Sequence, residues 1–142
     1  EGDYGYTART STCNNIKQKK HVVSFSSYSD VPTSDEHQLA LAVVNHPVSV
    51  AIEADQPDFQ FYKSGVFNAS CGTKLDHGVL AVGYGKQDDM NYWIVKNSWG
   101  ESWGENGYIR ILKDSNQTGG ECGILMDASY PVITLKNKYR VE

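Results

Sequence analysis

Residues 75–85 read LDHGVLAVGYG and residues 92–100 read YWIVKNSWG, and these two stretches decide the fold class. Each contains a short apolar run bounded by glycine or polar residues, which is typical of a largely buried β-strand. If the two strands lie side by side and antiparallel, His77 at the start of the first can meet Asn97 at the end of the second. The sequence therefore predicts two polar side chains at one end of an apolar sheet.

A contact between His77 and Asn97 would have a chemical consequence. An amide oxygen that accepts a hydrogen bond from one imidazole nitrogen fixes the ring and its tautomer, and it leaves the other nitrogen free to act as a base. A neighbouring Trp99 would shield that hydrogen bond from water. The residues alone leave a second interpretation open, in which His77 is a core residue bonded to a backbone carbonyl and Asn97 only makes a turn.

Trp99 and Trp103 lie four residues apart, and a glycine follows each of them. Loops seldom carry two large aromatic side chains unless these pack over something. The pair is interpreted either as a structural staple or as the wall of a site, and the residues do not decide between the two.

One helix is predicted after residue 32. Thr33 precedes Glu36 at the spacing of a capping box, and apolar residues follow at helical intervals through residues 39–44. Pro47 cannot extend a helix, so we expect the helix to end at Asn45 or His46.

Several further short strands are predicted from alternating or short apolar runs. They fall at residues 48–52, 108–111 and 132–135, with one short strand near residues 21–25 inside a polar connecting segment. One main helix followed by short strands and glycine-rich turns indicates an α+β fold built on an antiparallel sheet or barrel.

Composition excludes several classes of protein. The chain has 142 residues, of which 39% are hydrophobic and 21% charged, as in one globular domain. No apolar run approaches the roughly 20 residues of a membrane span. The net charge of -4 argues against a nucleic-acid surface, and the one basic cluster, Lys17, Lys19 and Lys20, is interpreted as a solvated loop. Because the sequence opens at Glu1 without an initiator Met or a signal-peptide pattern, we expect a processed or partial product.

The cysteines and sequons point to the secretory pathway. Three cysteines, Cys13, Cys71 and Cys122, leave at least one thiol that is free or bonded outside this chain. Asn68 and Asn116 each begin an N-x-[ST] sequon and are candidate glycosylation sites.

A metal site is not expected. The candidate ligands His37, His46 and the adjacent Asp76–His77 pair match no standard ligand spacing. The sequence predicts no metal and no cofactor.

Four motifs together resemble the papain-like cysteine peptidases, and among these the cathepsin-L-like group. Residues 75–85 are similar to the strand that carries the family's catalytic His, and residues 97–110 to the signature around its catalytic Asn. Residues 120–131 resemble the C-terminal signature, and residues 4–13 resemble the crossing between the family's two lobes. The similarity covers nearly all of residues 1–135.

The resemblance implies the catalytic roles. His77 is the general base, Asn97 orients its ring, and Trp99 covers the hydrogen bond between them.

The resemblance also implies the fate of the cysteines. Cys71 and Cys122 match a disulfide within the family's second lobe, whereas Cys13 matches a cysteine whose partner lies in the first lobe and is unpaired in this chain.

Five positions match substrate-binding residues of the family. Ala51, Gly78 and Asp127 match the pocket for the second substrate residue before the cut. Because Ala51 and Gly78 are small, the pocket should accept a bulky apolar side chain, and Asp127 at its base would also favour Arg or Lys. The alternative is that Asp127 only faces water or caps a turn. Asp76, beside His77, and Trp103, on the primed side of the cleft, complete the set.

The sequence departs from the family in one respect. The family carries its nucleophile in a C-G-[SA]-C-[WY] motif roughly 130 residues or more before the His, and no such motif precedes His77 here. The chain therefore resembles the C-terminal two-thirds of such an enzyme. We expect residues 1–29 to be an inter-lobe segment that belongs partly to an absent first lobe, residues 30–135 to be the papain-like second lobe, and residues 136–142 to be a frayed tail.

Two functions are compatible with these observations. In the first, the chain is the C-terminal lobe of a papain-like cysteine endopeptidase and is inactive alone, because the nucleophile is not in it. In the second, it is an inactive homologue that binds peptides or inhibitors. The first implies an N-terminal lobe, peptide substrates, and cystatin-like inhibitors or a propeptide as partners, with no nucleic acid, membrane or cofactor. The expected location is lysosomal or vacuolar, or secreted.

Overall fold

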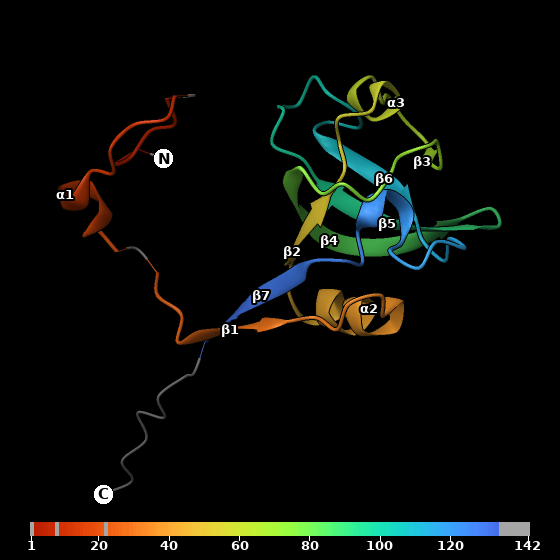
Figure 1. Cartoon of the computed structure of the whole chain (residues 1–142), viewed down its shortest axis with the longest axis horizontal. Helices are drawn as coiled ribbons and strands as arrows, with labels where there is room; N and C mark the ends of the chain where they lie inside the picture. Colours follow the sequence, from red (N-terminus) through yellow and green to blue (C-terminus); the bar gives the residue numbers. More distant parts are fainter. Residues whose placement is uncertain (1, 8, 22, 134–142) are drawn as a thin grey trace, which may run out of the picture.

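A seven-stranded sheet forms the centre of the computed structural model, which describes residues 2–7, 9–21 and 23–133 (Figure 1). The strand order is β1-β7-β2-β4-β5-β6-β3, and all neighbours are antiparallel except β3 and β6. The strands are β1 (Ser27–Asp30), β2 (Val48–Ile52), β3 (Val66–Phe67), β4 (His77–Gln87), β5 (Met90–Lys96), β6 (Tyr108–Leu112) and β7 (Ala128–Val132). The helices are α1 (Asn15–Gln18), α2 (Glu36–Asn45), α3 (Pro57–Gln60) and a 3-10 helix, η1 (Glu121–Gly123). The expected α+β class with one main helix is confirmed, and the sheet is open.

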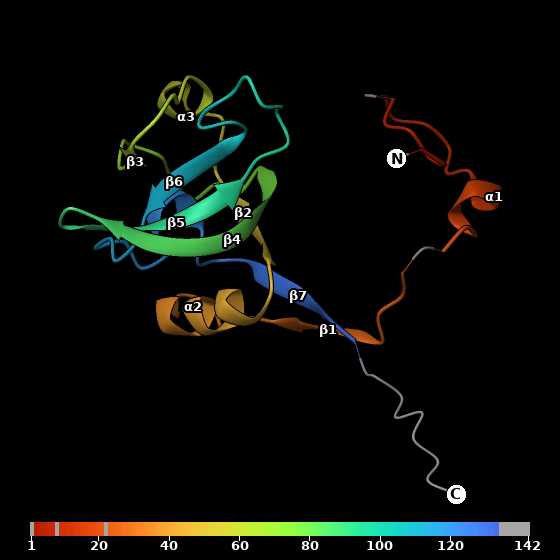
Figure 2. The ribbon, with the colours of Figure 1, turned by 180° about the vertical axis from the view of Figure 1, so that it is seen from behind.

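The core is formed by the buried side chains that alternate with more exposed ones along the strands. In β5 and β6, Trp93, Val95, Ile109 and Ile111 are completely buried, while the residues between them are partly exposed. Successive side chains of a strand point to opposite faces of the sheet. The buried residues of β5 and β6 therefore share one face, and this face lies in the interior. Phe59 of α3 joins the same core, and Figure 2 shows α3 and β3 beyond β6, on the side of the sheet away from α2.

Helix α2 begins two residues later than the capping box predicts. Its N-cap is Asp35, whose side chain accepts a hydrogen bond from the backbone N–H of Gln38 at 2.9 Å. The expected cap, Thr33, lies too far upstream and its hydroxyl contacts the carbonyl of Met126 instead. A cap acts only on the free N–H groups of the first turn, so the residue directly before that turn takes the role. The predicted end at Asn45 is confirmed.

The predicted strand near residues 21–25 is wrong, because the described residues of that stretch form no strand. The strand lies at β1, where Ser27 to Asp30 pair with Val132 to Ser129 of β7. A strand forms where a partner can complete its backbone hydrogen bonds, and β7 offers partners only at this register.

The last predicted strand also starts earlier than expected. β7 spans Ala128–Val132, and Ile133 is already outside it. Residues 134–135 of the predicted strand and the predicted tail, 136–142, lie outside the described residues.

The N-terminal segment, residues 2–26, differs from everything after it. Every described residue in it is exposed, and both views show it, with α1, apart from the sheet (Figures 1 and 2). The expected domain boundary at residues 29–30 stays a prediction. Across the described ranges, the longest helix has 10 residues, and none is long and apolar enough to cross a membrane.

Candidate active site

The antiparallel pairing of β4 with β5 brings His77 and Asn97 together. β4 begins at His77, β5 ends at Lys96, and Leu80 lies opposite Lys96 in the ladder. The start of one strand and the end of the other therefore occupy the same end of the sheet. His77 Nε2 and Asn97 Oδ1 are 2.8 Å apart, which is hydrogen-bond distance.

A second hydrogen bond fixes the roles of the atoms in that contact. The backbone N–H of Ser98 donates to the same Asn97 Oδ1 at 2.7 Å. An N–H can only donate, so this atom of Asn97 is the accepting oxygen and His77 Nε2 must carry the hydrogen. The lone pair of neutral His77 then lies on Nδ1, which is the atom available to take a proton. Asn97 is only 6% exposed, so water competes little for its amide oxygen.

Trp99 covers the His77 ring. The two rings stack with centroids 5.1 Å apart and planes 28° apart. On its other edges Trp99 makes T-shaped contacts with Phe59 at 5.8 Å and with Trp103 at 5.2 Å. The indole N–H of Trp103 donates to the carbonyl of Gln60 at 2.9 Å, which ties this aromatic cluster to α3. The Trp pair therefore packs on the core, as the staple interpretation predicts, and its role as the wall of a site stays a prediction.

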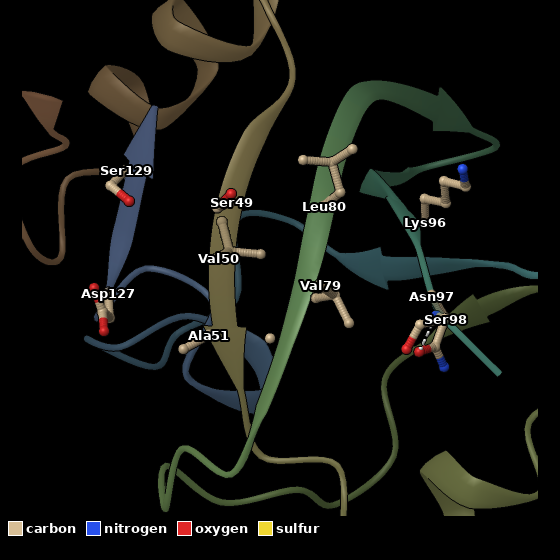
Figure 3. Close-up of a pocket in the computed structure, with 11 residues that line it drawn as sticks. Ser49, Val50, Ala51, Val79, Leu80, Lys96, Asn97, Ser98, Asp127 and Ser129 are labelled. Atoms are coloured by element: carbon tan, nitrogen blue, oxygen red, sulfur yellow. Dashed lines mark hydrogen bonds between the residues drawn. The ribbon is translucent and has the colours of Figure 1, made fainter. Parts of the chain in front are cut away.

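A cavity of about 750 Å³ lies beside the His77–Asn97 pair. Ala51, Gly78 and Asp127, the three residues that sequence analysis groups into one pocket, all line it together with Asn97. Figure 3 shows β2 and β4 across its middle, Asp127 and Ser129 on one side, and Asn97 and Ser98 on the other.

Small residues keep the middle of this cavity open. Ala51 and Gly78 are direct partners across β2 and β4, and a Cβ added at Gly78 would meet no atom within 4 Å. Asp127 is exposed on the wall, and its backbone carbonyl accepts the N–H of Ala51 at 2.9 Å. The arrangement gives an apolar floor with a carboxylate at one side.

Sequence analysis missed other residues that line the cavity. Ser49 and Leu80 are a facing pair two residues along from Ala51 and Gly78 on their strands, and Ser129 follows two residues after Asp127. The two-residue period of a strand is the signal that could have identified all three, since residues i and i+2 share a face. Lys96 adds a cation to the opposite wall.

Two of the expected substrate-binding residues, Asp76 and Trp103, do not line this cavity, and their roles stay predictions. Asp76 does not line the cavity; its carboxylate accepts the backbone N–H of Ala54 at 2.9 Å and so joins the loop before β4 to the end of β2. Trp103 is also outside the cavity and belongs to the aromatic cluster next to Trp99. Asn68 and Asn116 of the two sequons are exposed.

The bonding of the three cysteines is the one that the resemblance implies. Cys71 and Cys122 form a disulfide, and Cys13 has a free, exposed thiol. Among the residues that the structure describes, the one cluster with metal-ligand chemistry is Cys71, Glu121 and Cys122. Its two sulfur atoms are bonded to each other, so neither is a thiolate that could hold a metal.

Comparisons with known proteins agree on one family. Residues 1–132 match the family model described as papain family cysteine protease. The chain is 56% identical over 134 residues to cysteine endopeptidase RepA of Oryza sativa subsp. japonica, covering 93% of this chain and 35% of that relative. It superimposes on the bromelain protease of Ananas comosus, solved with the E64 inhibitor, with a TM-score of 0.86 and 43% identity, covering 94% of this chain and 61% of that one. The ragweed pollen cysteine protease Amb a 11, solved in its proform, gives a TM-score of 0.88 at 38% identity and covers 96% of this chain and 42% of its own. The chain thus spans about a third of the length of the curated relative.

Proposed function

The chain belongs to the papain family of cysteine proteases, and on this premise we propose that it supplies the general base, His77, and its orienting residue, Asn97, to a Cys–His–Asn endopeptidase. The observation that carries the proposal is the 2.8 Å contact between His77 Nε2 and Asn97 Oδ1, with Nδ1 left as the proton acceptor. Stacking of Trp99 on the imidazole supports a fixed ring orientation.

The proposed chemistry uses a thiol from outside this chain. A cysteine beside His77 Nδ1 transfers its proton to the ring, and the resulting thiolate attacks the carbonyl carbon of the substrate peptide. The imidazolium returns that proton to the departing amine, and water then hydrolyses the acyl-enzyme. Throughout the cycle Asn97 keeps the Nε2–H bond and prevents the ring from turning.

The chain alone is proposed to be inactive. Cys71 and Cys122 are consumed in a disulfide, and Cys13 lies in the exposed N-terminal segment. None of the three stands in the C-G-[SA]-C-[WY] context of the family's nucleophile. The proposed partner is therefore an N-terminal lobe that carries this motif, and a propeptide and cystatin-like inhibitors are the proposed regulators of the assembled cleft.

The cavity supports a proposal about substrate. Ala51 and Gly78 leave space for a bulky apolar side chain, and Asp127 gives an Arg or Lys a carboxylate to pair with. We propose a preference for apolar or basic residues two positions before the cut. The disulfide and the exposed sequons support a lysosomal or vacuolar, or secreted, location with glycosylation at Asn68 or Asn116.

Peptidase assays on two proteins test this function: the chain alone, and a complete protease in which the N-terminal part of the rice relative RepA precedes this chain. The chain alone should hydrolyse no dipeptide substrate, and the complete protease should. In the complete protease His77→Ala should abolish turnover, whereas Asn97→Ala should weaken it less, because it removes orientation and keeps the base. Turnover by the purified chain that survives His77→Ala would overturn the proposal and would favour another catalytic centre.

The complete protease also tests the proposed substrate preference of the pocket. Asp127→Ala should lower the ratio of Arg-Arg to Phe-Arg dipeptide hydrolysis, since it removes the carboxylate and leaves the apolar floor. An unchanged ratio means that Asp127 does not contact the substrate.

A further inference from the structure

Two glutamates are buried near the Cys71–Cys122 disulfide. Glu53 follows β2 and is 5% exposed, and Glu121 precedes Cys122 and is 4% exposed. Within the described part of the chain neither forms an ion pair. A buried carboxylate without a cation is unfavourable unless hydrogen bonds replace its water, so the partners of each glutamate show what it does.

The partners of Glu53 lie in the loop that precedes the catalytic histidine. Its Oε2 accepts a hydrogen bond from the backbone N–H of Lys74. Gln56 donates to its Oε1 at 3.0 Å. A Cβ at Gly72 would come within 2.5 Å of Glu53 Oε2, so the loop approaches the carboxylate as closely as a glycine allows. Glu53 thus contacts two residues of the loop, Gly72 and Lys74.

This loop connects the disulfide to His77. It spans residues 72–76, between Cys71 and the first residue of β4. Its far end is held by Asp76, whose N–H donates to the carbonyl of Ile52 at 3.0 Å. The backbone N–H of Glu53 itself donates to the carbonyl of Cys122 at 2.9 Å. The disulfide and β2 fix the two ends, and Glu53 fixes the middle.

We propose that Glu53 is a positioning residue for His77: by holding loop 72–76 it sets where the imidazole stands against Asn97 and against the nucleophile. The inference rests on the proposed function, since it concerns the placement of that same base. The donors from Lys74, Gln56 and Gly72 hold the pKa of Glu53 below its ordinary value, so the carboxylate form that these N–H groups need persists into acidic solution.

Glu121 provides a matched control. It is equally buried and adjoins the same disulfide, yet its hydrogen bond comes from Gln117 Nε2 at 2.9 Å and it makes none to residues 72–76. Burial raises the pKa of Glu121, but the control rests on its contacts: replacing it by glutamine removes no hydrogen bond to residues 72–76. In contrast, a glutamine at position 53 replaces one of the two carboxylate oxygens, which accept from Lys74 N–H and Gln56 Nε2, by an NH₂ that can only donate.

The test compares Glu53→Gln, Glu121→Gln and His77→Ala with the wild-type complete protease. Glu53→Gln should lower kcat by about tenfold with KM within about twofold, because a shift of a catalytic group well below 1 Å is sufficient for such a loss. It should also move the acidic limb of thiol alkylation by iodoacetamide to higher pH, since a displaced imidazolium stabilises the thiolate less. Glu121→Gln should leave both quantities near wild type.

Each outcome bears on the inference. Equal losses in both glutamine variants, or no loss in Glu53→Gln, would overturn it. If Glu53→Gln does not fold, Gln56→Ala removes one donor to the same carboxylate and should lower kcat about two- to threefold at constant KM; an unchanged kcat overturns the inference. His77→Ala separates the two proposals, because wild-type turnover in that variant refutes the proposed function, whereas loss there with normal Glu53→Gln activity refutes only the role of Glu53.

Discussion

Residues 27–133, called the lobe below, bury many of their apolar side chains, whereas the described residues of the segment 2–26 bury none. In the lobe, Ile109 and Trp93 are completely buried in one core. In the segment, Tyr6, Ile16 and Val23 are 85%, 82% and 74% exposed. The difference is that the only buried apolar core among the described residues lies in the lobe, whereas the segment adds no buried side chain to it; under the proposed function, the exposed apolar side chains of the segment contact the first lobe.

The largest expected effect on stability comes from replacing the cysteines of the lobe, in contrast to the cysteine of the segment. The disulfide closes 51 residues of the lobe, and the chain-entropy model assigns such a loop about 4 kcal/mol. Replacing Cys71 and Cys122 together by Ala should lower the free energy of unfolding of the chain by about that amount. Cys13→Ala should change it by less than about 0.5 kcal/mol, because the thiol is exposed. Urea unfolding of both variants measures the contrast, and a comparable loss in Cys13→Ala would mean that the segment contributes to the fold.

The next effect compares two isoleucines. Ile109 is completely buried in β6, so Ile109→Ala should cost about 3 kcal/mol in lost transfer and cavity energy. Ile16→Ala removes the same atoms from an exposed site and should cost less than about 0.5 kcal/mol. The two unfolding free energies should therefore differ severalfold in the isolated chain. Addition of the first lobe should make Ile16→Ala more costly, and a lasting neutrality of that change in the complete protease would argue against the segment as a contact surface.

A smaller effect concerns pH and the buried acids. Hydrogen bonds lower the pKa of Glu53. Its contribution to the free energy of unfolding is therefore present above the ordinary glutamate pKa near 4.5, and it is lost as the pH falls through the lowered pKa. The pKa of Glu121 is raised by burial, so its contribution is present below about 4.5 and is lost as the pH rises through the raised value.

The midpoints of urea unfolding, measured from acidic to neutral pH, test both of these pH dependences. Glu53→Gln should flatten the loss of stability on the acidic side, and Glu121→Gln should flatten the loss toward neutral pH. Asp3 of the segment, exposed and paired with Lys20 at 2.8 Å, is the control, because an exposed pair contributes little. If Asp3→Asn alters the pH profile as much as either glutamine variant, burial is not the cause.

Sequence patterns predict some features of the fold and of the site and not others. Strands β4 and β5 follow from short apolar runs bounded by glycine or polar residues, and the contact of His77 with Asn97 could be anticipated from two strand ends. The ends of shorter elements could not, because β1 lies where β7 offers hydrogen-bond partners. The contact of Glu53 with the backbone N–H of Lys74 could not be predicted from sequence patterns, since the two residues are 21 positions apart and the donor is a backbone group. Periodicity thus predicts faces, while loops that carry a site need tertiary contacts.

The smallest effect uses two helix caps with the same chemistry. Asp35 caps α2 of the lobe, accepting the N–H of Gln38 at 2.9 Å, and Asn14 caps α1 of the segment, accepting the N–H groups of Ile16 and Lys17 at 3.1 Å each. Loss of a cap costs about 1 kcal/mol only if the helix is coupled to the folded structure. Helix α2 is coupled, because Leu39 and Val43 are buried in the core, whereas α1 has four residues, none of them buried.

We therefore expect Asp35→Ala to lower the free energy of unfolding by about 1 kcal/mol and Asn14→Ala to leave it unchanged. Thr33→Ala, at the cap position that the sequence pattern favours, should cost less than Asp35→Ala, because its hydroxyl makes only a 3.5 Å contact with the Met126 carbonyl. Chemical denaturation of the three variants ranks them. A loss in Asn14→Ala equal to that in Asp35→Ala would show that α1 unfolds together with the lobe, and the division of the chain into two regions would then have to be abandoned.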